Sequence, residues 1–183
     1  MALDEPLSRA VFLDRDGVLS RSDVRDGKPY APTRFEDFDI LPDAAGALGA
    51  LKKDRFLLIV VTNQPDVGNG HVDRAVVEDM NARLARDLPI DAVKVCYHGQ
   101  ADGCDCRKPK PGMILDAAEE FGVDLAASFM VGDRWSDIDA GRAAGCRTVF
   151  IDRGYGERRP EAQDFTAASM GEAADLIRTA AHP

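Results

Sequence analysis

The stretch Ala10-Val-Phe-Leu-Asp-Arg-Asp-Gly17 decides the fold class, because four apolar residues run directly into two acidic residues and a glycine. A short, fully apolar run of this kind is typical of a strand buried on both faces of a parallel sheet. Four further runs have the same character and are also bounded by turn residues: Phe56–Val61, Ala92–Val95, Phe129–Val131 and Thr148–Ile151. We therefore predict five buried parallel strands.

Amphipathic stretches lie between these runs and are long enough to be crossover helices. The predicted helices are Ala44–Lys53, Val72–Asp87, Gly112–Phe121, Asp137–Ala144 and, close to the end of the chain, Gly171–Ala181. Strands that alternate with helices predict an α/β fold with a doubly wound, Rossmann-like parallel sheet, whose ligands bind beyond the carboxyl ends of the strands. No internal repeat or linker divides the sequence, so we expect residues 1–183 to form a single domain.

The composition is that of an acidic globular protein. The 183 residues include 23 Lys and Arg against 32 Asp and Glu, a net charge of −9, and 45% of the residues are hydrophobic. This balance excludes a disordered chain and argues against a nucleic acid or an anionic membrane as the main partner. The start of the chain carries charged residues where a signal peptide would be apolar, and no apolar stretch approaches the ~20 residues that span a bilayer. We expect a cytoplasmic monomer that acts on a small molecule.

Two pairs of acidic residues follow predicted strands. Asp14 and Asp16 come directly after the first strand, and Asp133 and Asp137 follow the fourth. Because the carboxyl ends of parallel strands meet at one edge of the sheet, we expect these carboxylates to lie close together. Neighbouring carboxylates repel one another unless a cation holds them. Magnesium suits the pattern, since it binds through few carboxylates and keeps several waters.

Groups that bind phosphate accompany the acids. Thr62, Asn63 and Gln64 follow the second strand and offer a hydroxyl and two amides, while Arg107 and Lys108 place two cations just before a helix. Such a set indicates phosphoryl transfer, with one carboxylate free to attack phosphorus. The sequence contains no Walker-type or Gly-x-Gly-x-x-Gly loop, which argues against a nucleoside triphosphate or a dinucleotide as the ligand.

Three of the four cysteines lie within eleven residues, together with a histidine. The cluster consists of Cys96, His98, Cys104 and Cys106, whereas Cys146 stands apart and has the context of an ordinary buried thiol. Cysteines separated by a single residue are poorly placed to form a disulfide with each other. A bound metal is the preferred interpretation of the cluster.

Four motifs, in this order, resemble those of the haloacid dehalogenase (HAD) superfamily of phosphatases: Asp14-x-Asp16-Gly17, Thr62-Asn63-Gln64, Lys108-Pro109 and Gly132-Asp133-x-x-x-Asp137. Together they cover nearly the whole chain. The first two motifs and the segment Cys104–Met113 are similar to a narrower group. That group contains the D-glycero-D-manno-heptose 1,7-bisphosphate phosphatases and the histidinol-phosphate phosphatases.

The resemblance implies a two-step reaction with a covalent intermediate. Asp14 would attack phosphorus to form an aspartyl phosphate, and Asp16 would protonate the leaving oxygen and later activate water. Magnesium would be bound by the Asp14 side chain, the Asp16 backbone carbonyl and Asp133, with Asp137 in support. Thr62 and Lys108 would hold the transferring phosphoryl group, and Arg107 would help to recognise the rest of the substrate.

The same group carries a zinc loop, which corresponds here to residues 96–106. The resemblance implies a structural zinc ion that is held by Cys96, His98, Cys104 and Cys106, because four protein ligands close a tetrahedral site. The loop ends directly at Arg107, so zinc would position the two cations that follow. Neither the interval from Asp16 to Thr62 nor the interval from Thr62 to Lys108 is long enough for a separate cap domain. In the group, Ser-Gly usually follows the Asn-Gln pair, whereas this chain has Pro65-Asp66.

The leading hypothesis is a magnesium-dependent heptose 1,7-bisphosphate phosphatase, and the nearest alternative is a histidinol-phosphate phosphatase. A polynucleotide 3′-phosphatase shares a Thr-Asn-Gln segment, but the net charge of −9 counts against it. A signalling receiver domain also forms an aspartyl phosphate at a strand end, but its phosphorylated residue lies on a later strand. The last alternative is a binding module without catalysis, although no essential catalytic residue is missing.

Overall fold

The strand β1 (Ala10–Leu13) lies at the centre of a parallel sheet of six strands in the computed structural model, which describes residues 7–182. The strand order is β5-β4-β1-β6-β7-β8. The other bounds are β4 (Leu57–Asn63), β5 (Ala92–Cys96), β6 (Phe129–Gly132), β7 (Arg147–Ile151) and β8 (Phe165–Ala167). The predicted α/β fold and the five predicted parallel strands are confirmed, although β5 lies at an edge of the sheet and is only half-buried along most of its length. β8 was not predicted, and it pairs with β7 at one edge of the sheet.

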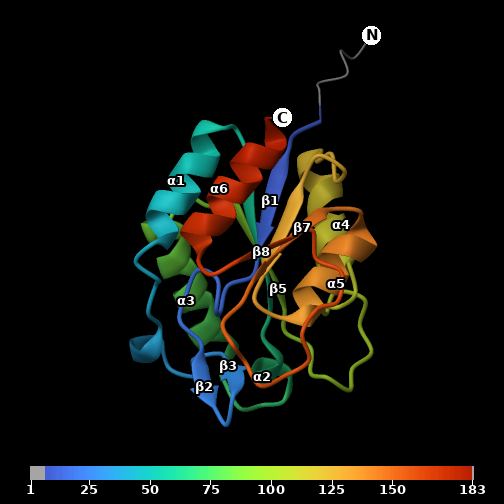
Figure 1. Cartoon of the computed structure of the whole chain (residues 1–183). Helices are drawn as coiled ribbons and strands as arrows, with labels where there is room; N and C mark the ends of the chain where they lie inside the picture. Colours follow the sequence, from blue (N-terminus) through green and yellow to red (C-terminus); the bar gives the residue numbers. More distant parts are fainter. Residues whose placement is uncertain (1–6, 183) are drawn as a thin grey trace.

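Helices cover both faces of the sheet (Figure 1). α1 (Ala44–Lys53), α3 (Arg74–Asp87) and α6 (Met170–Ala181) pack on one face, and α4 (Gly112–Phe121) and α5 (Trp135–Ala144) pack on the other. Successive side chains of a strand point to opposite faces, so β1 supplies Val11 and Leu13 to the first core and Ala10 and Phe12 to the second. All four are fully buried, which accounts for the unbroken apolar run.

The sheet extends from β1 on both sides. β4 pairs with one side of β1 and β6 with the other, so the strand order reverses at this point. Ligands of doubly wound sheets bind at such a reversal, outside the carboxyl ends of the strands. The fold therefore brings together the segments that follow β1, β4 and β6, which are the segments that contain the predicted site residues.

The insertions between the motifs are small. Between β1 and β4 lie a hairpin of β2 (Asp23–Arg25) and β3 (Lys28–Tyr30), a 3₁₀ turn η1 (Phe35–Asp37) and α1. After β4 comes a short helix, α2 (Pro65–Gly68), and both it and the hairpin lie near the carboxyl edge of the sheet (Figure 1). Residues 7–182 contain no cap domain, as predicted. Within residues 7–182, none of the helices combines the length and the hydropathy that a membrane span requires.

Candidate active site

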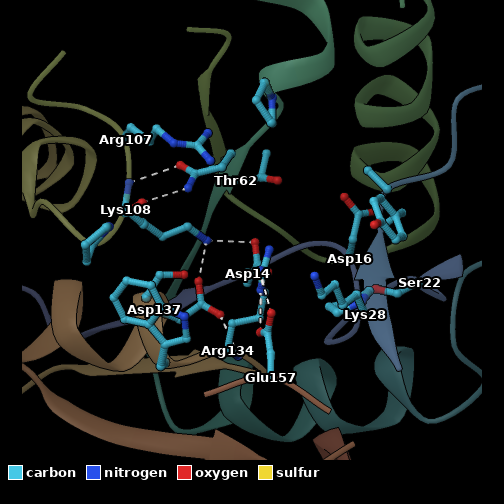
Figure 2. A pocket seen from close by; sticks show the side chains of 18 of the residues that line it. Asp14, Asp16, Ser22, Lys28, Thr62, Arg107, Lys108, Arg134, Asp137 and Glu157 are labelled. Carbon is cyan, nitrogen blue, oxygen red and sulfur yellow. Dashed lines mark hydrogen bonds and ion pairs between the residues drawn. The ribbon is translucent and has the colours of Figure 1, made fainter. Parts of the chain in front are cut away.

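A buried lysine connects the strand ends. The Nζ atom of Lys108 lies 2.8 Å from Asp14 Oδ1, 2.8 Å from Asp137 Oδ1 and 2.7 Å from the carbonyl oxygen of Val61 (Figure 2). Its side chain is only 3% exposed. Burial alone would lower the pKa of Lys108, but Asp137 and Asp14 together raise it above its ordinary value, so the ammonium stays charged. Lys108 therefore fixes the position of Asp14.

Three carboxylates crowd around this ammonium. Asp14, Asp133 and Asp137 each place an oxygen within 4.8 Å of the others. Burial raises the pKa of Asp14 to about 6, and burial together with the neighbouring carboxylates raises the pKa of Asp133 well above its ordinary value. Among residues 7–182, the buried Oδ1 atom of Asp133 has no hydrogen-bond partner. One lysine does not neutralise three acids, so the group fits a divalent cation such as magnesium.

Gly17 allows this close approach. Its φ of +88° lies in the left-handed region, which favours glycine, and a Cβ atom there would lie 1.8 Å from Asp133 Oδ2. The turn that follows Asp16 therefore needs a residue without a side chain. The glycine of the Asp-x-Asp-Gly motif has a steric role at the carboxylate group.

The two side-chain amides at the end of β4 bind protein groups. Asn63 Nδ2 donates to Lys108 O at 3.0 Å, and Lys108 N donates to Asn63 Oδ1 at 3.1 Å. Gln64 Nε2 donates to Thr62 Oγ1 at 3.0 Å and to Asp16 Oδ2 at 2.8 Å. Thr62 and Asn63 line the same cavity as Asp14, whereas Gln64 is buried and does not line it. The two amides thus hold Lys108 and Asp16 in place.

Asp16 is held by three side chains. Besides Gln64, Ser20 Oγ donates to Asp16 Oδ1 at 3.0 Å and Arg15 Nη2 donates to Oδ2 at 2.9 Å. Arg15 is fully buried, and its Nη1 atom also donates to Asn81 Oδ1 on α3 at 2.9 Å. The Asp16 carboxylate lines the same cavity as Asp14, so both acids of the first motif face one space.

A cavity of about 540 Å³ lies over Asp14. Its lining includes the segment after β1, the end of β4 and the start of α2. The β2–β3 hairpin, the first turn of α5, the segment that ends the predicted zinc loop and the loop after β7 complete it. Figure 2 shows Arg107 and Lys28 on opposite sides of Asp14. The Nη1 atom of Arg107 is buried and has no hydrogen-bond partner within residues 7–182. The cavity thus offers cations in addition to Lys108.

The four predicted zinc ligands converge. Cys96 Sγ lies 3.6 Å from His98 Nδ1 and 3.7 Å from Cys104 Sγ, and His98 Nδ1 lies 3.2 Å from Cys106 Sγ. All four ligating atoms lie within 4.8 Å of one another. A tetrahedral zinc ion with Zn–S bonds of about 2.3 Å would separate its sulfur ligands by about 3.8 Å. The cluster has the donor set and spacing of a zinc site, consistent with the predicted zinc loop.

The loop that holds this cluster packs against α2. A Cβ atom at Gly68 would lie 2.5 Å from Gly99 N and 2.6 Å from Tyr97 O, so only glycine permits the contact. Asn69 Nδ2 also donates to Gln100 Oε1 at 2.9 Å. The segment that begins with Pro65-Asp66 therefore supports the cysteine-rich loop.

Sequence reasoning did not identify several groups of the site. Arg15 and Ser20 were missed because the motif is defined by Asp14 and Asp16, and the sequence does not show that these two side chains donate to the Asp16 carboxylate. Tyr155 was also missed, although its hydroxyl donates to Asp133 Oδ2 at 2.7 Å. The position of Tyr155 could have identified it, because Tyr155 lies in the loop after β7 and functional residues of such sheets lie after strand ends.

The comparisons with known proteins agree with this geometry. Residues 105–176 match the family model described as HAD-hydrolase-like. The chain is 38% identical over 159 residues to the D-glycero-beta-D-manno-heptose-1,7-bisphosphate 7-phosphatase of Pseudomonas aeruginosa, a match that covers 83% of this chain and 86% of the relative. The chain belongs to this family of HAD phosphatases.

Further relatives of the phosphatase lead to the same assignment. The heptose-bisphosphate phosphatase of Escherichia coli K12 is 37% identical over 179 residues, which cover 91% of each chain. The solved D,D-heptose 1,7-bisphosphate phosphatase from B. bronchiseptica, complexed with magnesium and phosphate, has a TM-score of 0.81 at 29% identity and covers 94% of this chain and 99% of that one. The predicted resemblance is confirmed, and the protein is a phosphoric monoester hydrolase.

Proposed function

We propose that the phosphatase removes the 7-phosphate from D-glycero-D-manno-heptose 1,7-bisphosphate through an aspartyl phosphate. The observation that carries this proposal is the placement of Asp14, which Lys108 fixes at the floor of an open cavity beside two more carboxylates. The two relatives whose alignments cover more than four fifths of this chain are named for this activity, and their names support the choice of sugar. We further propose that the enzyme acts as a monomer.

In the first step, a carboxylate oxygen of Asp14 attacks phosphorus, and the bond between phosphorus and the sugar oxygen breaks. Asp16 gives a proton to that oxygen as the sugar leaves. The Lys108 ammonium, which lies beside β4, and the hydroxyl of Thr62 stabilise the charge on the phosphoryl oxygens, because fixed donors need no reorganisation during the reaction. The product of this step is the aspartyl phosphate and the free alcohol.

In the second step, Asp16 takes a proton from a water molecule that attacks the aspartyl phosphate. The acyl phosphate bond breaks, phosphate leaves, and the Asp14 carboxylate is restored. Splitting one displacement into two steps lets a single acid serve first as proton donor and then as proton acceptor. Gln64, Ser20 and Arg15 hold Asp16 in the orientation that both steps require.

The donors present fit two metal ions. Asp14, the backbone carbonyl of Asp16 and Asp133 would hold magnesium, while both oxygens of Asp137 already accept hydrogen bonds, from Lys108 and from the Arg134 amide. When bound, magnesium supplies positive charge against the phosphoryl oxygens. Zinc would be held by Cys96, His98, Cys104 and Cys106 and would have a structural role, because four protein ligands leave no open position.

We propose that Arg107 binds the phosphate that is not removed. Its buried Nη1 atom has no partner within residues 7–182, and a guanidinium is suited to bind phosphate with two parallel hydrogen bonds. We expect Arg107→Met to raise the KM for the bisphosphate about tenfold, as the loss of one hydrogen bond to a charged group predicts. The KM for the same heptose with only a 7-phosphate should stay unchanged, as measured by phosphate release.

Arg86→Met is the matched control, because Arg86 is 70% exposed on α3 and, within residues 7–182, forms an ion pair with Asp87 alone. It should leave both KM values unchanged. An equal rise in KM for the bisphosphate and the monophosphate after Arg107→Met would refute the assignment of Arg107 to the second phosphate.

A substrate panel tests the proposed function. We expect kcat/KM to be highest for one anomer of heptose 1,7-bisphosphate, in comparison with fructose 1,6-bisphosphate, histidinol phosphate and a 3′-phosphorylated oligonucleotide. Preference for histidinol phosphate would replace the proposed substrate and keep the mechanism. Low and uniform rates across the panel would reject the heptose assignment.

A further inference from the structure

The loop between β7 and β8 begins with a segment, Asp152–Glu157, that crosses the carboxyl edge of the sheet; we name it the strap. Its contacts lie on either side of Tyr155 and reach three separate parts of the site. Arg153 Nε donates to Gly17 O at 2.9 Å, Gly156 N donates to Gly27 O at 2.8 Å, and Glu157 accepts two hydrogen bonds of 2.7 Å from Arg134. The strap is therefore fixed to the first motif, to the hairpin and to the start of α5.

Tyr155 occupies the middle of the strap and contacts the carboxylate group. Its hydroxyl donates to Asp133 Oδ2 at 2.7 Å, whereas Asp133 Oδ1 is buried and has no partner within residues 7–182. The two oxygens of Asp133 thus have different environments, one bound to protein and one free.

We propose that Tyr155 is a positioning residue for the divalent cation, because it holds one oxygen of Asp133 and thereby directs the other toward the cation. The inference rests on the proposed magnesium site. A carboxylate that ligates a metal is oriented by the group that hydrogen-bonds its second oxygen, and loss of such a group typically weakens metal binding about 10- to 100-fold. Without the hydroxyl, Asp133 could rotate within its buried site.

The space around the hydrogen bond agrees with this role. A Cβ atom at Gly17 would lie 1.8 Å from Asp133 Oδ2 and 2.9 Å from the Tyr155 hydroxyl. The glycine of the first motif therefore leaves room both for the carboxylate and for the group that orients it. Within residues 7–182, Asp133 is the one carboxylate that has a buried oxygen without a hydrogen-bond partner, and Tyr155 binds its other oxygen.

The test is the affinity for magnesium of the zinc-loaded, magnesium-free protein, measured by calorimetry for the wild type and for Tyr155→Phe. We expect the Kd for Mg²⁺ to rise about tenfold or more in the variant. With p-nitrophenyl phosphate as the substrate, the Mg²⁺ concentration for half-maximal rate should rise in parallel, and kcat at saturating Mg²⁺ should return close to the wild-type value.

Tyr97→Phe is the matched control, since Tyr97 also contributes a phenol but packs under Arg74 and does not line the cavity. It should leave the Kd for Mg²⁺ unchanged. An unchanged Kd in Tyr155→Phe, with or without a lower Tm, would assign the hydroxyl a purely structural role and overturn the inference. If the wild type itself bound no Mg²⁺, the proposed magnesium site would fail instead, so the two failures are distinguishable.

Discussion

Asp14→Asn should lower kcat by at least about 10⁴-fold and leave a folded protein, because the amide cannot form the aspartyl phosphate. The fold should persist, since Lys108 keeps its contact with Asp137. The pKa of Asp14 is raised to about 6, so at neutral pH its buried charge opposes folding, and the substitution removes that charge. In magnesium-free buffer, the Tm of the variant should therefore equal or exceed that of the wild type. Phosphate release and thermal unfolding measure the two effects.

The control for this substitution is Asp175→Asn, which makes the same chemical change at a side chain that is 80% exposed on α6. It should retain both the rate and the Tm of the wild type. Activity of the Asp14→Asn protein near the wild-type level would contradict the proposed mechanism, because no other residue of the cavity is assigned as nucleophile.

Cys104→Ser should remove zinc and much of the stability together. Zinc contributes about 10 kcal/mol to the folding of small zinc peptides, where nothing else holds the chain. Here the sheet has its own core, so a loss of about 4 kcal/mol is expected, which lowers the Tm by about 10 °C. The kcat/KM should fall as well, because the loop ends at Arg107 and Lys108. Zinc content per chain and thermal unfolding are the measurements.

Cys146→Ser provides the comparison, because Cys146 is buried in the core between α4, α5 and the sheet, and lies outside the cysteine cluster. This variant should lose some stability, since a hydroxyl replaces a buried thiol, but it should retain one zinc ion per chain. A full complement of zinc in Cys104→Ser would contradict the assignment of that ligand.

The elements with clear boundaries in the sequence were predicted to the residue. Ala10–Leu13 ends where an apolar run meets Asp14, and Gly112–Phe121 is bounded by Pro111 and Gly122. The start of α5 was placed two residues late, at Asp137 instead of Trp135, because that acid lies inside the first turn and accepts a hydrogen bond from Arg134 N. Such a contact depends on side-chain direction, which periodicity does not report.

Short or exposed elements were not predicted. β8 has three residues, too few to show a period, and its pairing with β7 follows from the tertiary fold. The β2–β3 hairpin is largely exposed, so its residues carry no alternating apolar pattern. Both elements are defined by their neighbours more than by their own composition.

The candidate site was likewise predicted only in part. The strand-end rule located Asp14, Thr62 and Asp133, because parallel strands bring their carboxyl ends to one edge. It did not determine which group each polar side chain binds. Asn63 binds the Lys108 backbone, and Tyr155 reaches Asp133 from a loop, so both contacts arise from segments far apart in the sequence.

The strand order also bears on how the protein is made. β1 contributes Asp14 early in synthesis, but its neighbour β6, which precedes Asp133, belongs to the last third of the chain. The strap and α6 come later still. A nascent chain on the ribosome therefore carries its nucleophile long before it carries a complete cation site. The ability to cleave phosphate esters should appear only when synthesis is nearly finished.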